Sequence, residues 1–353
     1  MNGASRVVGE KTLQDIMEIP RSIDAIRENF DSLKEVAASI VNRNCRCLYL
    51  TGCGSSYYSA MLMSIPLQIH RPKLNVRVIP SSEILMYLIN TLSEECCIVA
   101  ISRSGETAET LEVMKRGRER GTYNVIITIS EKSESIKYAD EYLYINVGVE
   151  RGIVMTKSFY SMSLAGLLIT LSMVAGKSSN MDLELDRLKE HAINTIEKRS
   201  IIFRLAENYI NMGINRFIVL GSGPSYPIAL EASLKLKESS YVAAEAMHAL
   251  EFRHGPIATL DKNVLVVIIN QDGKSYSYVY KLYEELRNIG ANVLRLSNKD
   301  LDEDTLPLSK TSYEELDALS AILLLQLITY GYTLASGLDI DSPRRLVRVV
   351  THY

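Results

Sequence analysis

The sequence lacks several features that would assign it at once to a functional class. Its formal net charge at pH 7 is only -3, which gives neither a basic surface for nucleic acid nor an acidic tail. The five cysteines show no CxxC or Cys/His spacing typical of a zinc site. Hydrophobic residues make up 47% and charged residues 23%, as in soluble globular proteins. We therefore expect no nucleic acid partner and no bound metal.

Signals for export or membrane insertion are also missing. The first twenty residues, MNGASRVVGEKTLQDIMEIP, contain no apolar core of signal-peptide length. Apolar runs such as LLLQLITYGYTLA are too short to span a membrane. The odd number of cysteines fits a reducing compartment best. We expect a cytoplasmic protein without a membrane partner, and the length of 353 residues suits two domains.

The chain contains an internal repeat. Residues 47–61 (CLYLTGCGSSYYSAM) can be laid over 217–230 (FIVLGSGPSYPIAL), with paired glycines, serine and tyrosine 169 residues apart. Two further pairs of strand-like segments match at nearly the same offset: 95–102 with 263–270, and 121–130 with 290–299. Three matches in the same order indicate two copies of one unit.

Each copy alternates short apolar runs with helix-like segments, which predicts a parallel sheet covered by helices on both faces. The expected fold class is α/β, with two doubly wound, flavodoxin-like subdomains of three α/β/α layers. The segment 11–43 has helical spacing with a break at Pro20, and 184–211 forms a matching prelude to the second copy. The region 175–186 is the candidate linker. The expected boundaries are 1–45 for an N-terminal helical segment, 46–178 and 184–335 for the two copies, and 336–353 for an extended tail.

Two hydroxyl-rich turns follow neighbouring strands of the first copy. GCGSS (52–56) and SRSGET (102–107) each lead from a strand into a helix. Ligands bind beyond the carboxyl ends of parallel strands, where helix N-termini offer unpaired N–H groups. Serine and threonine add neutral donors, and glycine lets the backbone approach closely. This combination predicts a phosphate site.

Three other interpretations compete with a phosphate site at the two turns. A single Gly/Ser turn is more often a helix cap than a ligand site, at about two chances in three, but two turns on neighbouring strands reverse those odds. A dinucleotide site fits worse, because Tyr57 stands where the third glycine of the fingerprint belongs. The segment GKS at 273–275 lacks the preceding glycine of a P-loop. The second copy has NQDG (270–273) where the first has SRSG, so only the first copy is expected to hold a phosphate.

Four segments resemble the tandem sugar isomerase (SIS) domains of glucosamine-6-phosphate synthase: GCGSSY, SRSGET, ERGIVMTKSF and PIALEASLKLKESSYVAAEAMHALEFRHGP. The resemblance runs from about residue 12 to the C-terminus. It implies two SIS domains without the glutamine-hydrolysing domain, whose cysteine nucleophile follows the initiator methionine, whereas residue 2 here is asparagine. The chain therefore resembles stand-alone members, which include amino-sugar-6-phosphate deaminases and deglycases.

The resemblance implies roles for particular residues. The phosphate and substrate site maps to Gly54, Ser55, Ser56, Ser102, Arg103, Ser104 and Thr107, with Arg103 where the synthase often has glutamine. Glu238 matches the base that moves a proton between sugar C1 and C2, and Lys235 matches a lysine beside it. His254 matches a histidine linked to ring opening, which in the family comes from the second subunit. A homodimer and the absence of any cofactor are thus implied.

The residue types suit this chemistry. A carboxylate can remove a proton beside a carbonyl and return it one carbon away. A histidine can protonate the ring oxygen, and a cation can stabilise the enediol. From spacing alone, Lys235 and Glu238 are more often an exposed helix ion pair, at about three to one, and a lone histidine such as His254 is more often structural, at about two to one. The resemblance reverses both preferences.

Two positions depart from the family. Arg348 stands where the synthase tail carries a lysine that bonds covalently to the sugar, and arginine is a poor Schiff-base nucleophile. Arg348 could still act as a fixed cation over the substrate. Met155 replaces a serine that contacts the sugar. The loss of that hydroxyl suggests a different substituent at C1 or C2, or a looser fit. Together the two departures argue against glucosamine 6-phosphate itself as the substrate, while recognition of the 6-phosphate is less affected.

Three functions follow. The leading hypothesis is an isomerase-type deaminase that interconverts glucosamine 6-phosphate and fructose 6-phosphate with ammonia. The second is a sugar-phosphate sensor without turnover, although the combination of Lys235, Glu238 and His254 argues for catalysis. The third is the synthase reaction, with ammonia supplied by a separate glutaminase subunit.

Overall fold

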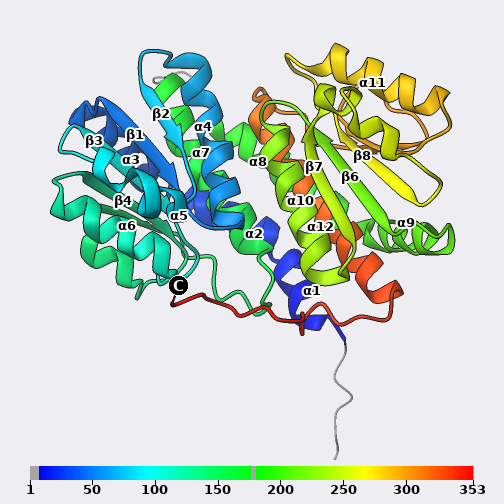
Figure 1. Cartoon of the computed structure of the whole chain (residues 1–353), viewed down its shortest axis with the longest axis horizontal. Coiled ribbons are helices and arrows are strands. Elements are labelled where there is room, and N and C mark those ends of the chain that lie inside the picture. Colours follow the sequence, from blue (N-terminus) through cyan, green and yellow to red (C-terminus); the bar gives the residue numbers. More distant parts are fainter. Residues whose placement is uncertain (1–7, 176–179, 353) are drawn as a thin grey trace, which may run out of the picture. The chain divides into compact units, whose positions relative to one another are not determined.

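The computed structural model describes residues 8–175 and 180–352, and in that part it contains two five-stranded parallel sheets (Figure 1). The strand order is β2-β1-β3-β4-β5 in the first sheet and β10-β9-β8-β6-β7 in the second. Read from its other end, the second order repeats the first, with each strand replaced by its counterpart five strands later. The predicted α/β fold class is confirmed, and the shared strand order supports the duplication.

The strands and helices have these bounds. The first sheet consists of β1 (Cys47–Thr51), β2 (Asn75–Val78), β3 (Cys96–Ile101), β4 (Tyr123–Thr128) and β5 (Glu141–Tyr144). The second consists of β6 (Arg216–Gly221), β7 (Ala243–His248), β8 (Val264–Ile269), β9 (Asn292–Ser297) and β10 (Thr305–Pro307). The longer helices are α1 (Glu10–Met17), α2 (Ile19–Glu28), α3 (Phe30–Arg43), α4 (Ser55–His70), α6 (Ala108–Glu119), α7 (Lys157–Ala175), α8 (Met181–Glu197), α9 (Arg199–Asn211), α10 (Ser225–Ser240), α11 (Tyr276–Asn288) and α12 (Glu314–Ala335). Shorter helical turns are α5 (Ser81–Glu83), η1 (Ile84–Leu88), η2 (Ile89–Thr91), η3 (Glu134–Tyr138), η4 (Ala249–Arg253) and η5 (Pro256–Thr259).

The central strands explain why the sequence forms parallel sheets. Every residue of β3 and of β8 is buried. A parallel strand covered by helices on both faces needs such a continuous apolar run rather than an alternating one. In the second sheet, β6 and β8 share a core with α11, where Val279, Leu282 and Leu286 face the strands.

The helical segments before each sheet match the predictions, with one correction. α1 ends at Met17 and Pro20 lies in the first turn of α2, where proline needs no hydrogen-bonded N–H. α8 and α9 cover the prelude predicted at 184–211. Part of the predicted linker, 176–179, lies outside the described residues. Its remainder from Met181 onward is wrong as a linker, because these residues begin α8 with acidic side chains in the first turn.

The described chain divides into two compact units, each assembled from separate segments. The first-sheet unit contains Arg21–Val149, Ser158–Asp186 and the tail from Val349. The second-sheet unit contains the residues up to Pro20, Glu150–Lys157 and Arg187–Arg348. Within the second-sheet unit, α12 packs against α9 and α10.

The expectation that no apolar run is long enough to span a membrane is wrong on length. In the described part, Lys157–Val174 and Glu314–Ala335 are long and apolar enough to do so. In each of them 89% of the apolar window is buried inside the protein. Their burial identifies them as core helices.

Four cysteines form two disulfides that the sequence spacing does not indicate. Cys45 is bonded to Cys97 and Cys47 to Cys96, whereas Cys53 is free. Cys47 and Cys96 are direct neighbours in the β1–β3 ladder. Both bonds therefore join the amino ends of the two strands whose carboxyl ends lead into the hydroxyl-rich turns.

Candidate functional site

The two hydroxyl-rich turns of the first-sheet unit lie next to each other because β1 and β3 pair in register, with Thr51 opposite Ala100. Gly54 has φ 53° and ψ −127°, a conformation that glycine adopts readily and other residues avoid. A Cβ atom on Gly52 would lie 2.9 Å from the carbonyl oxygen of Ile101. The first turn therefore depends on glycine for its shape and for its close approach to β3.

Side-chain contacts connect the first turn to the helix after the second. The Cys53 thiol lies 3.6 Å from the Thr110 hydroxyl on α6, and Ser81 Oγ lies 3.0 Å from the same hydroxyl. The Gly52 carbonyl accepts a hydrogen bond from the Ser81 N–H at 3.0 Å. Burial raises the pKa of the Cys53 thiol, so it stays neutral at physiological pH.

The serines of the second turn are arranged as donors. Ser102 Oγ accepts the Gly105 N–H at 3.0 Å, and Ser104 Oγ accepts the Glu106 N–H at 3.1 Å. A hydroxyl that accepts a hydrogen bond retains its own proton to donate, which a phosphate requires. Ser102 and Ser56 are 2% and 5% exposed, so a ligand that reaches them must leave water behind.

One expected donor is already used. The Ala108 N–H, the first amide of α6, donates to the carbonyl oxygen of Val350 in the tail at 3.0 Å. Thr107 is the N-cap residue of α6, and Ser55 is the first residue of α4 and 4% exposed. Arg103 is half-buried, and its carbonyl oxygen accepts the Thr128 hydroxyl at 3.1 Å. The second turn is thus fixed by side-chain hydrogen bonds more than by free helix amides.

Gly105→Ala is expected to destabilise the second turn. Gly105 has φ +69°, and a Cβ there would lie 1.5 Å from Ser133 Oγ. Gly148 has φ +71° with no atom within 4 Å of its Cβ position, so Gly148→Ala carries only the cost of the backbone conformation. That cost is about 1–2 kcal/mol, and we expect Gly105→Ala to exceed it by about 1–3 kcal/mol because of the overlap. Urea denaturation measures both; equal losses would contradict a closed turn.

The second-sheet unit carries a buried ion triad on α10. Lys235 Nζ lies 2.7 Å from Glu238 Oε2 and 3.2 Å from Glu231 Oε1. The side chains of Lys235 and Glu231 are 3% and 0% exposed, whereas Glu238 keeps 19% of its side chain exposed. Burial alone would lower the pKa of Lys235, but the charges of the two glutamates outweigh it and raise the pKa. Lys235 is therefore a fixed cation.

This geometry rules out the exposed-ion-pair interpretation of Lys235 and Glu238. It also adds Glu231, which sequence reasoning missed. Its spacing of four residues before Lys235 was visible, but such a spacing is equally common on solvated helices. Because Glu231 holds one side of the ammonium, the partly exposed carboxylate of Glu238 is left at the edge of the triad, where a substrate could reach it.

His254 is exposed and lies between two short helical turns, η4 and η5. Its N–H donates to the carbonyl oxygen of Glu251 at 3.0 Å, and Gly255 follows with φ +123°. The exposed position suits a side chain that acts in the site of a second subunit. Its assignment to a second subunit stays a prediction.

Met155 and Arg348 also belong to the second-sheet unit. Met155 is half-buried in the turn Glu150–Thr156 that precedes α7. The guanidinium of Arg348 donates to two carbonyl oxygens of that turn, Glu150 O and, at 3.3 Å, Gly152 O. The tail arginine thus contacts the protein main chain.

In the second copy, the turn 270–273 corresponds to the turn 102–105 of the first copy, and it is filled by an acidic side chain. Glu314 Oε2 accepts the Lys274 N–H at 3.0 Å, and a Cβ on Gly273 would lie 2.0 Å from the same oxygen. Asp272 pairs with Lys299 at 3.0 Å. A carboxylate already occupies the amide that an anion would use, which supports the expectation that this copy holds no phosphate.

Within residues 8–175 and 180–352, no group of three or more His, Cys, Asp or Glu side chains is arranged to hold a metal.

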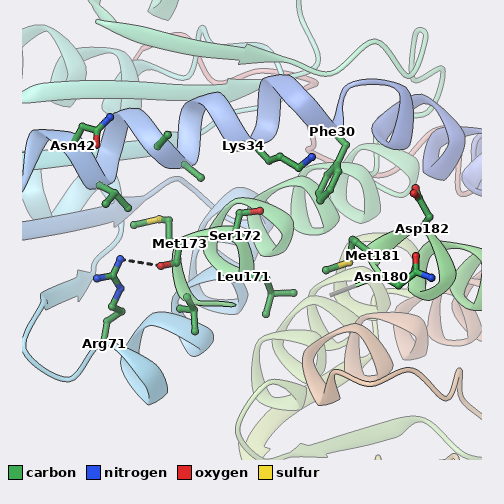
Figure 2. Close-up of a pocket in the computed structure, with 14 residues that line it drawn as sticks. Phe30, Lys34, Asn42, Arg71, Leu171, Ser172, Met173, Asn180, Met181 and Asp182 are labelled. Carbon is green, nitrogen blue, oxygen red and sulfur yellow. Dashed lines mark hydrogen bonds between the residues drawn. The ribbon is translucent and has the colours of Figure 1, made fainter. Parts of the chain in front are cut away.

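A cavity of about 1090 Å³ lies between α3 and the end of α7, where Arg71 donates to the Met173 carbonyl oxygen at 2.9 Å (Figure 2). Its lining includes Val174 and Asn180, on either side of the undescribed residues 176–179, so we assign it no ligand.

Comparison with known proteins agrees with the predicted fold and with the resemblance to SIS domains. The SIS domain model matches residues 43–172 and 213–305. Glutamine–fructose-6-phosphate aminotransferase (isomerizing) of Thermococcus kodakarensis is 32% identical over 350 residues, which cover 96% of this chain and 57% of that protein. The chain therefore spans little more than half the length of this relative.

Two solved structures match nearly the whole chain. The C-terminal domain of glucosamine-fructose-6-phosphate aminotransferase from Francisella tularensis has a TM-score of 0.82 at 25% identity, covering 94% of this chain and 98% of that one. Glucosamine-6-phosphate deaminase from Thermotoga maritima has a TM-score of 0.78 at 28% identity, covering 96% and 99%. Together with the duplicated sheets and the hydroxyl-rich turns, these matches show that the chain belongs to the SIS domain family.

Proposed function

We propose that the protein is a sugar-phosphate isomerase that releases ammonia from an amino-sugar 6-phosphate, with glucosamine 6-phosphate as substrate and fructose 6-phosphate as product. The observation that carries the proposal is the triad on α10. A carboxylate that is partly exposed, next to a lysine held protonated by a second buried carboxylate, suits proton transfer beside a carbonyl or imine carbon.

In this proposal Glu238 removes the proton from C2 of the open-chain amino sugar and returns it to C1, which leaves an imine at C2. Water then adds to the imine carbon, the C–N bond breaks, and the ketone and ammonia are released. The fixed charge of Lys235 stabilises the negative charge that develops on the oxygen between these steps. His254, from a second copy of the chain, assists ring opening. The hydroxyls of Ser56, Ser102, Ser104 and Thr107 hold the phosphate with neutral donors.

The likeness to a deaminase over 99% of that chain supports ammonia release. The aminotransferase relative, at 32% identity, supports the reverse reaction, with fructose 6-phosphate and ammonia as substrates and a separate glutaminase subunit as ammonia source. Both directions use the same proton transfer. Their balance depends on the ammonia supply, and the expected location of the enzyme is the cytoplasm.

The test is an assay of ammonia and fructose 6-phosphate formed from glucosamine 6-phosphate, with unphosphorylated glucosamine as the matched control. We expect turnover of the phosphorylated sugar and at least a 100-fold lower kcat/KM without the phosphate, because its hydrogen bonds to the two turns amount to roughly 3 kcal/mol. Thermal stabilisation by amino-sugar 6-phosphates without turnover in either direction would favour the sensor and contradict the enzyme.

A further inference from the structure

The turn Glu150–Thr156 is held from several sides within the second-sheet unit. Inside the turn, Glu150 Oε1 accepts the Thr156 N–H at 2.9 Å, and Glu150 is only 1% exposed. From α12, Gln326 Nε2 donates to the Thr156 carbonyl oxygen at 3.2 Å. A turn with so many fixed main-chain groups has little freedom to move the side chain of Met155, which lies within it.

From α1, the buried carboxylate of Asp15 holds the start of the turn. Asp15 is 0% exposed, and its Oδ2 accepts the N–H groups of Arg151 at 2.7 Å and Gly152 at 2.8 Å. Its Oδ1 accepts the Arg151 guanidinium at 3.1 Å and lies 3.8 Å from the ammonium of the fully buried Lys157. Burial still outweighs these contacts and raises the pKa of Asp15, so they offset only part of the cost of removing the carboxylate from water.

From the tail, Arg348 donates to two carbonyl oxygens of the same turn, those of Glu150 and Gly152. The tail is itself joined to α1, because Asp341 accepts the Lys11 N–H and the Thr12 N–H, each at 2.9 Å. Thus α1, the turn and the tail are connected in a closed set of hydrogen bonds.

We propose that Asp15 and Arg348 are positioning residues that together fix the 150–156 turn, Asp15 through its amides and Arg348 through its carbonyl oxygens. Arg348 acts on the main chain and is not a cation that binds the substrate. The inference rests on the proposed function in one respect: the turn carries Met155, at the position where the resemblance implies a sugar contact.

Arginine suits this role better than the lysine found in the family. Its planar guanidinium carries several N–H donors in a fixed arrangement and can contact two carbonyl oxygens at once. A lysine ammonium has three donors on one nitrogen and lacks this planar arrangement of donors on separate nitrogens. Arg348→Lys keeps the positive charge but loses the planar set of N–H donors. It therefore distinguishes a residue that holds the main chain from a cation that binds the substrate.

The experiment measures hydrogen exchange of the Arg151 and Gly152 amides in the full-length protein and needs no substrate. Asp15→Asn replaces one acceptor oxygen by an NH₂ group, and Arg348→Met removes the guanidinium. We expect amide exchange to accelerate about tenfold or more in both, as for a lost charge-assisted hydrogen bond. The controls are Glu18→Gln and Arg344→Met. Glu18 pairs with Arg151 and Lys157 but does not contact the turn amides, and Arg344 lies over Tyr241.

A kinetic measurement then tests the role of Arg348 in catalysis. We expect Arg348→Lys and Arg348→Met to raise KM for glucosamine 6-phosphate by similar factors, about five- to tenfold, with a smaller change in kcat. Unchanged exchange in Asp15→Asn and Arg348→Met overturns the proposal, as does Arg348→Lys with wild-type KM. If the wild type turns over no amino-sugar phosphate, the proposed function fails, and the exchange rates still decide whether the turn is held as described.

Discussion

Glu238→Gln is expected to lower kcat for ammonia release from glucosamine 6-phosphate by about 1,000-fold. The carboxamide has the shape of the carboxylate but cannot take up the proton that moves between the two sugar carbons, and general base catalysis contributes about 10²- to 10⁴-fold. KM should change little, because the change removes an interaction needed only in the transition state. Steady-state kinetics with coupled detection of ammonia measures both constants.

The control for this change is Glu207→Gln, which removes an exposed carboxylate from α9 of the same unit. It should leave kcat and KM at wild-type values. Lys235 keeps Glu231 as its partner in Glu238→Gln, so we expect this variant to remain folded. A Glu238→Gln enzyme that retains more than about a tenth of the wild-type kcat would remove Glu238 from the reaction.

Lys235→Met is expected to lower the free energy of unfolding by about 3–5 kcal/mol, because it removes the cation that lies within 3.2 Å of both Glu231 and Glu238. Glu231 is 0% exposed, so water cannot replace the lost partner. The corresponding fall in Tm is roughly 6–20 °C. Thermal and urea denaturation at pH 7 measure it, and the same variant should lose activity.

A double change distinguishes this explanation from a simple loss of packing. Adding Glu231→Gln to Lys235→Met removes the buried negative charge and should recover part of the stability, which a packing defect would not. The pH dependence follows from the raised pKa of Lys235. Its contribution is fully present below the ordinary lysine pKa of 10.5 and is lost only as pH rises through the higher folded value, so it stays constant between about pH 6 and 9.

Much of the fold was predictable because two sequence signals, the apolar strand segments and the repeated glycine turns, are local. Apolar β-branched runs as long as β3 and β8 indicate buried parallel strands, and the repeat of the Gly52 and Gly221 turns indicated the duplication. In the structure, close backbone atoms leave no room for a side chain at either glycine. A Cβ on Gly221 would lie 2.3 Å from the Ser225 carbonyl oxygen, and a Cβ on Gly52 would lie 2.9 Å from the Ile101 carbonyl oxygen.

What the sequence could not predict depends on contacts between distant residues. Asp15 and Arg151 are 136 positions apart, and no local pattern connects them. The Cys45–Cys97 and Cys47–Cys96 bonds exist because β1 and β3 are neighbours, which only the folded sheet determines. The long α12 looks like a membrane segment in composition, and only its burial identifies it as a core helix.

The division of the chain into two units has a practical consequence for dissecting the protein. The chain passes from one unit to the other five times, after Pro20, Val149, Lys157, Asp186 and Arg348. A single proteolytic cut, for example after Asp186, would leave the second-sheet unit without Glu150–Lys157 and without α1, which carry Asp15 and its partners. The second-sheet fragment made by this cut would lack the buried Ile16 and Ile19 of its core and should not fold alone.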